Sequence, residues 1–103
     1  MLDELWGSVV VSFVYDITAR SALLEARVLE NGRKQSLVLS LVGVERLEIQ
    51  RPDTNAWVYA EITEAHVRAA GEATELSLLF WNEPNRLLAR CDSWTLEQKR
   101  SVT

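Results

Sequence analysis

One stretch, residues 36–49 with the sequence SLVLSLVGVERLEI, constrains the fold more than any other part of the chain. Its first half alternates leucine with serine or valine, and this period of two predicts a strand with one buried face. Gly43 interrupts the alternation, and Leu47 and Ile49 resume it. A glycine inside such a run typically marks a bulge or a sharp bend. We therefore expect a central strand that bends at Gly43 and continues, with neighbouring strands paired around it.

The segment before this strand, residues 22–30, is open to two interpretations. Leu24 and Val28 lie four residues apart, as on one face of a helix. The sequence Asn31-Gly32, however, is the kind of two-residue turn that joins antiparallel strands. Folding the chain about that turn pairs Val28 with Gln35, Ala26 with Leu37, Leu24 with Leu39, Ala22 with Leu41, Arg27 with Ser36 and Glu25 with Val38. The first four pairs share one largely apolar face, so we predict a hairpin rather than a helix.

A second hairpin is predicted from residues 74–81 and 86–94, which are joined by the loop NEPN. With a loop of this length, three pairs meet on one face: Phe80 with Leu87, Leu78 with Ala89, and Leu76 with Cys91. That face is uniformly apolar, and we expect it to point into the core.

Two further strands are predicted. Residues 6–15, WGSVVVSFVY, are rich in β-branched and aromatic residues, and both faces of this strand are expected to be largely covered. Residues 57–69 predict a long strand that is broken or bulged near Glu64. Because alanine and glutamate favour helices, a short helix at residues 63–70 is the alternative for this segment.

The predicted elements amount to about seven strands in a single domain, residues 1–103, with a loose start at residues 1–5 and a frayed tail at residues 95–103. Each hairpin has one apolar face that it cannot bury alone. The two hairpins must therefore face each other or close into a barrel. We predict an all-β fold, either an antiparallel β-sandwich or an open barrel.

Composition and charge exclude several classes of function. The chain has a net charge of -4 with acidic and basic residues interspersed, whereas nucleic-acid binding requires a concentrated positive surface. The apolar runs are too short to span a membrane, and the N-terminus carries acids where a signal peptide needs positive charge. A single cysteine cannot form an internal disulfide. We therefore expect a cytoplasmic protein that binds neither nucleic acid nor membrane.

Few residues offer reactive chemistry. His66 and Cys91 are too few for a metal site, and a Cys–His nucleophile pair is disfavoured because Cys91 falls on the apolar face of the second hairpin. Two acid pairs would suit a cleft, Glu45 with Glu48 and Glu61 with Glu64, but their spacing is equally that of solvated surface charge. The chain also lacks a glycine-rich phosphate loop. We expect no enzymatic activity, no cofactor and no bound metal.

The outward face of the second hairpin has an unusual composition. Alternation from Phe80, which is expected to point inward, places six candidate interface residues there: Leu79, Trp81, Arg86, Leu88, Arg90 and Trp94. This set is not typical of a solvated face, and tryptophan and arginine are frequent anchors of protein interfaces. Either another part of the chain or a partner must cover such a face. We predict a protein-binding surface, with a second copy of the chain as the simplest partner.

A small-ligand or carbohydrate-binding β-sandwich is the alternative function. Trp57, Tyr59 and Trp81 supply flat aromatic rings of the kind that stack on the apolar faces of sugars. Such modules are usually secreted, and no signal peptide is visible, so protein binding ranks first.

Residues 8–50 contain a strand, then a hairpin, and then an apolar strand with a Gly-Val step, LVLSLVGVERLEI. This order of segments resembles a group of small bacterial proteins that includes YxiG-like proteins and immunity families linked to polymorphic toxins. The resemblance implies a β-rich cytoplasmic bacterial protein that acts by binding another protein. An acidic immunity protein would gain association rate toward a basic toxin, because opposite charges steer the encounter.

Overall fold

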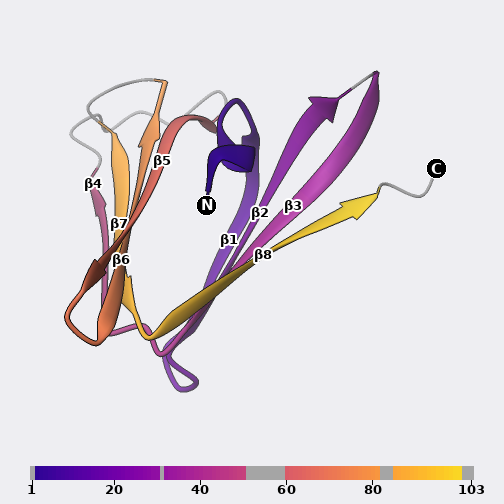
Figure 1. Cartoon of the computed structure of the whole chain (residues 1–103). Helices are drawn as coiled ribbons and strands as arrows, with labels where there is room; N and C mark the ends of the chain where they lie inside the picture. Colours follow the sequence, from indigo (N-terminus) through magenta and orange to yellow (C-terminus); the bar gives the residue numbers. More distant parts are fainter. Residues whose placement is uncertain (1, 31, 51–59, 82–84, 101–103) are drawn as a thin grey trace.

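The computed structural model describes residues 2–30, 32–50, 60–81 and 85–100 (Figure 1). Within these ranges the chain forms eight strands and one short 3-10 helix: η1 (Asp3–Leu5), β1 (Val9–Asp16), β2 (Ser21–Glu30), β3 (Arg33–Val42), β4 (Arg46–Gln50), β5 (Ala60–Ala70), β6 (Ala73–Phe80), β7 (Arg86–Cys91) and β8 (Ser93–Arg100). Neighbouring strands are antiparallel, and the sheet has the order β4-β7-β6-β5-β1-β2-β3-β8. The predicted all-β fold is confirmed, as one open sheet of antiparallel strands.

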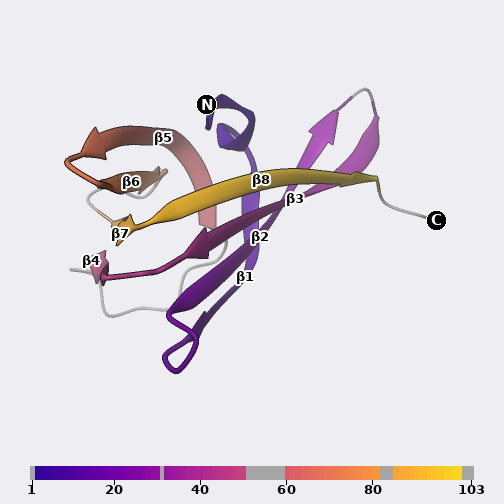
Figure 2. The same ribbon diagram turned by 60° about the horizontal axis from the view of Figure 1, so that its bottom comes forward.

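The sheet is bent into two halves that face each other. The first half-sheet consists of β1, β2, β3 and β8, and the second half-sheet consists of β4, β5, β6 and β7. Figure 1 shows the two halves diverging from a common corner at the bottom of the view, and Figure 2 shows that corner turned forward. At the corner β3 runs on into β4 and β7 runs on into β8, so that two long strands cross from one half to the other. This crossing places the core between the halves.

Gly43 makes the bend at the corner possible. Its φ of 67° lies in the left-handed region, which is costly for a residue with a β-carbon. The backbone N–H of Glu45 donates to the carbonyl oxygen of Arg90 at 2.8 Å. The backbone N–H of Asp92 donates to the carbonyl oxygen of Val42 at 2.9 Å. These bonds tie the two bent strands together, and the predicted bend of the central strand at Gly43 is confirmed.

The hairpin of β2 and β3 has the predicted register. Val28 pairs with Gln35, Ala26 with Leu37, Leu24 with Leu39, Ala22 with Leu41, Arg27 with Ser36 and Glu25 with Val38. The helical alternative for residues 22–30 is therefore wrong. Glu30 pairs with Arg33, so the two strands are separated by two residues, the spacing on which the predicted register depends.

The hairpin of β6 and β7 exists as predicted, but the predicted register was wrong by two residues. Leu78 pairs with Leu87, Leu76 with Ala89 and Thr74 with Cys91. A shift of two residues leaves every side chain on the same face of the sheet, so both registers bury the same leucines. The hydrophobic pattern therefore identifies the buried face of this hairpin and cannot identify its register.

Residues 95–100 do not form a frayed tail, contrary to the prediction. They belong to β8, which runs along β3 and pairs Leu96 with Leu39 and Trp94 with Leu41. Both Trp94 and Leu96 pack against the core. The strand predicted over residues 86–94 is in fact two strands, because the chain bends at Asp92 and crosses to the first half-sheet. Residues 101–103 lie outside the described part of the chain.

Bulges interrupt β1 and β5. The extra residue in β1 is Val11, between Val10 and Ser12, and the strand pairs on both sides but leaves much of its outward face exposed. The expectation that both faces of this strand are covered was therefore wrong. In β5 the irregularity falls between Ile62 and Glu64, which confirms a bulged strand and excludes the helical alternative. Residues 57–59 of the predicted strand lie outside the described residues.

The core between the half-sheets is built mainly from leucine. Both hairpins contribute buried residues to it: Leu24, Leu37, Leu39 and Leu41 from the first, and Leu76, Leu78 and Leu87 from the second. Leu5 of the helix η1 and Leu2 just before the helix are almost fully buried, so the expected loose start was wrong. These two leucines lie three residues apart, about one helical turn, and both belong to the hydrophobic core.

Candidate functional site

The structure separates the six predicted interface residues. Arg86, Leu88 and Arg90 lie along the outward side of β7, and Leu79 lies beside them on β6. Trp81 follows β6 directly and is 50 % exposed. Trp94 does not belong to this surface, because the bend at Asp92 carries it to the first half-sheet, where it packs against the core.

The outward face of the second half-sheet is a grid of three rows that run across β4, β7, β6 and β5. Strand register gives the rows as Arg46–Arg90–Glu75–Arg68, then Glu48–Leu88–Ser77–His66, then Gln50–Arg86–Leu79–Glu64. We call this surface the outer grid. Charged residues occupy all of its first row, whereas Leu88 in the second row and Leu79 in the third row are its two apolar residues.

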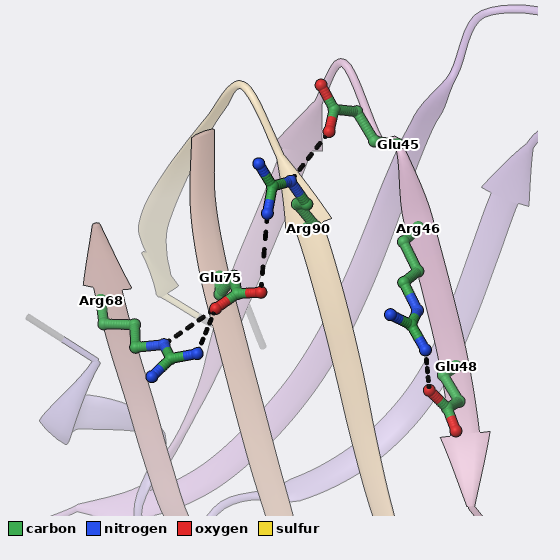
Figure 3. A network of polar contacts seen from close by, with 6 residues as sticks. All are labelled: Glu45, Arg46, Glu48, Arg68, Glu75 and Arg90. Carbon is green, nitrogen blue, oxygen red and sulfur yellow. Dashed lines mark hydrogen bonds and ion pairs between the residues drawn. The ribbon is translucent and has the colours of Figure 1, made fainter. Parts of the chain in front are cut away.

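Ion pairs connect the first row of the outer grid (Figure 3). Glu75 lies between two arginines: its Oε1 is 2.6 Å from Nη2 of Arg68, and its Oε2 is 3.9 Å from Nη1 of Arg90. The Nε of Arg90 also donates to Oε2 of Glu45 at 2.9 Å. At the edge strand, Nη2 of Arg46 donates to Oε2 of Glu48 at 3.3 Å. These pairs are partly or largely exposed, so each contributes little to the stability of the fold.

A depression of about 340 Å³ lies over this part of the outer grid. Its charged and polar lining consists of Arg46, Glu48, His66, Arg68, Glu75, Ser77 and Arg90. Its apolar lining includes the side chain of Leu88, the outward-facing leucine of β7. The depression therefore combines one apolar contact surface with several hydrogen-bond donors, which is the usual make-up of a site for a small polar ligand.

Neither predicted acid pair forms. Glu45 pairs with Arg90, whereas Glu48 pairs with Arg46. The Oε2 atom of Glu64 is hydrogen-bonded to Nε2 of His66 at 3.1 Å. Glu61 and Glu64 lie on opposite sides of the bulge in β5, so the regular alternation of the strand does not relate their side chains.

Trp6 stacks edge-on against His66 with ring centroids 6.2 Å apart. In the described residues, no three histidine, cysteine, aspartate or glutamate side chains come together to hold a metal ion.

Cys91 is buried in the core, as predicted, and we expect it to resist alkylation in the folded protein. Burial, and then the carboxylate of Asp92, raise the pKa of the thiol and so reduce the reactive thiolate. Iodoacetamide at about pH 8 should modify the chain quickly only after denaturant is added, as measured by mass spectrometry.

The raised pKa of Cys91 also makes the stability of the fold depend on pH. Because the thiol ionises more readily in the unfolded chain, the folded state should lose stability as pH rises above the ordinary thiol range. Fast alkylation without denaturant would contradict the buried position and revive a nucleophilic role for Cys91.

An exposed apolar cluster lies on the other half-sheet, and sequence reasoning missed it. On the outward side of the first half-sheet, Val14 pairs directly with Leu23, and Val38 and Val42 lie diagonally beside Leu23 on β3. We call these four residues the apolar face. Val14 is 60 % exposed, Leu23 45 % and Val42 55 %, whereas Val38 is buried at 8 %. The sequence of residues 9–15 already places valines on both faces of the first strand. No other segment had been assigned to cover the outward one, and this could have revealed the cluster.

Acidic side chains surround the apolar face. Glu25 and Glu97 flank Val38 on the two neighbouring strands, and Asp16 lies at the far end of β1. Arg27 lies beyond Glu25 on β2, with Nη2 of the arginine 4.0 Å from Oε2 of the glutamate. Five further neighbours on adjoining positions are small and hydroxylated: Ser12, Ser21, Ser40, Ser93 and Thr95. The rim around the apolar face is therefore polar and acidic.

Comparison of the sequence with models of known protein families gives no match, and comparison with curated proteins gives none. Within the described ranges, no helix combines the length and the apolar character needed to cross a membrane. Trp57 and Tyr59, two of the three aromatic residues considered for sugar stacking, lie outside those ranges.

Proposed function

We propose that this chain is a non-enzymatic protein-binding module and that the apolar face is its contact surface. The observation that carries the proposal is the cluster of Val14, Leu23 and Val42, which lie side by side and remain about half exposed. An antiparallel sheet with a solvated side normally presents polar residues on that side. Removal of such an apolar cluster from water is the main favourable contribution to protein association.

The rim of the apolar face supports a partner with basic side chains. Asp16, Glu25 and Glu97 border the cluster, and the whole chain has a net charge of -4. A basic partner would be steered toward this surface, and salt would slow the association. A second copy of the chain would instead bring the same acids together, which disfavours self-association through this face.

An immunity protein that blocks a basic toxin in the bacterial cytoplasm is one form that this function would take. The acidic rim favours this form, and so does the order of segments in residues 8–50. The outer grid is the second candidate surface for a protein. Its two leucines are bordered by ion-paired residues, so it presents less contiguous apolar area than the apolar face does.

Replacing Leu23 with lysine is expected to abolish partner binding while the fold is retained. The lysine removes the centre of the apolar cluster and repels a basic partner, and a loss of about 2 kcal/mol or more would weaken binding at least about 30-fold. The measurement is affinity capture from the native host with the wild type and the variant. The dissociation constant of the purified partner is then measured at several salt concentrations. Circular dichroism of both proteins reports the fold.

The matched control is Leu88→Lys, the same substitution on the outer grid, which should leave binding unchanged. A basic partner that is lost with Leu23→Lys, retained with Leu88→Lys and weakened by salt would support the proposal. Recovery of no partner, or equal binding by the wild type and Leu23→Lys, would contradict it. If Leu88→Lys alone abolishes binding, or alone dissociates a wild-type dimer in sedimentation velocity, the contact surface is the outer grid.

A further inference from the structure

Two arginines on the outer grid lie directly opposite each other. Arg46 on β4 and Arg90 on β7 are partners in the strand register, and both point to the outward side of the second half-sheet. Like charges in directly opposed positions destabilise a sheet. No single carboxylate bridges this pair: Arg46 turns to Glu48, whereas Arg90 turns to Glu45 and Glu75 (Figure 3). An anion placed between the two arginines would bridge them, which none of these glutamates does.

We propose that the depression over Leu88 binds a small organic acid, with its carboxylate between Arg46 and Arg90 and its apolar body against Leu88. The depression of about 340 Å³ is large enough for such a ligand, since pockets for small molecules span roughly 300–1,000 Å³. A guanidinium group matches a carboxylate in shape and charge, because it donates two parallel hydrogen bonds. This site lies on the half-sheet opposite to the apolar face and does not depend on the proposed protein contact.

The charges around the depression favour an acid with a single negative charge. Three arginines line it, Arg46, Arg68 and Arg90, together with two glutamates, Glu48 and Glu75. The lining alone carries one more positive than negative formal charge, and Glu45 outside the lining also pairs with Arg90. A monocarboxylate adds only one negative charge beside these glutamates, whereas a phosphate dianion would add two.

Both arginines of the site can turn toward a ligand at little cost. The side chain of Arg46 is 75 % exposed and that of Arg90 is 40 % exposed. Ion pairs with this exposure contribute little, so exchanging the contact between Arg46 and Glu48 for a contact with the ligand loses little. Ser77, beside Leu88 in the register, adds a hydroxyl group that can donate to the second carboxylate oxygen.

The test is an NMR titration of the backbone amides with four small probes. Benzoate has both a carboxylate and an apolar ring, acetate lacks the ring, benzyl alcohol lacks the charge, and phenyl phosphate carries a larger charge. We expect saturable shifts at Ser77, Leu88 and Ala89 with benzoate, and weaker effects with the other three probes. The double variant Arg46→Gln and Arg90→Gln should bind benzoate at least about tenfold more weakly, because two charged hydrogen bonds are lost.

Arg27→Gln is the matched control, because it removes the same charge from an exposed ion pair on the first half-sheet. It should leave the benzoate titration unchanged, as should Leu23→Lys, and the amide spectrum of each variant reports its fold. Shifts that do not saturate, equal responses to all four probes, or benzoate binding that survives in the double variant would each overturn the proposal. Loss of benzoate binding in the double variant with partner binding retained would separate this site from the proposed protein contact.

Discussion

Replacement of Leu39 with alanine is expected to lower the free energy of unfolding by about 2–5 kcal/mol, as large-to-small changes in a well-packed core do. Leu39 is almost fully buried, and it lies between Leu24 on β2 and Leu96 on β8. Its removal leaves a cavity that neighbours on both sides of β3 line. Leu39→Asp should prevent folding, because the carboxylate would be buried without a partner.

The adjacent residue provides the control for this prediction. Val38 points to the outward side of the same strand, between Glu25 and Glu97. Val38→Thr should cost less than Leu39→Ala, although Val38 is itself only 8 % exposed, because threonine nearly keeps the volume of valine and leaves no large cavity. Equilibrium denaturation in urea, followed by circular dichroism, measures both losses. If Val38→Thr were the more damaging change, β3 would face the core with the opposite set of side chains.

Replacement of Gly43 with alanine is the second change with a large expected effect. The left-handed backbone conformation alone costs roughly 1–2 kcal/mol for a residue with a β-carbon. At Gly43 the added carbon would also collide with Asp92, whose Cβ would be 2.9 Å away and whose Oδ2 would be closer still. The carboxylate of Asp92 can rotate away, but its Cβ is held in place with the backbone, whose N–H donates to the carbonyl oxygen of Val42. The corner where both long strands cross should loosen.

Gly71→Ala isolates the collision from the backbone strain. Gly71 has nearly the same conformation, with a φ of 68° against 67° for Gly43, but nothing lies near its added β-carbon. We expect Gly43→Ala to be clearly more destabilising than Gly71→Ala in thermal and urea unfolding. Asp92→Ala should recover part of the difference when combined with Gly43→Ala. Equal losses at the two glycines would show that the corner has room for a side chain.

The candidate surfaces were only partly predictable from the sequence. The period of two correctly groups Leu79, Arg86, Leu88 and Arg90 on one side of the second hairpin, because alternate residues of a strand point to opposite faces. It fails for Trp94, since a bend at Asp92 moves the chain into the other half-sheet. The apolar face was missed because alternation shows which residues share a side, and only the packing of a second layer decides which side is covered.

The sequence by itself determined that the chain is built of strands, how β2 pairs with β3 and where the central strand bends, at Gly43. These features depend on local physics: alternation selects a strand, an Asn-Gly turn sets the register of a hairpin, and a glycine accepts a left-handed conformation. Only the tertiary structure decided the register of β6 with β7, the place of β8 beside β3 and the burial of Leu2 and Leu5. In each of these cases several arrangements would bury the same apolar side chains. The choice among them depends on contacts between segments that are far apart in the chain.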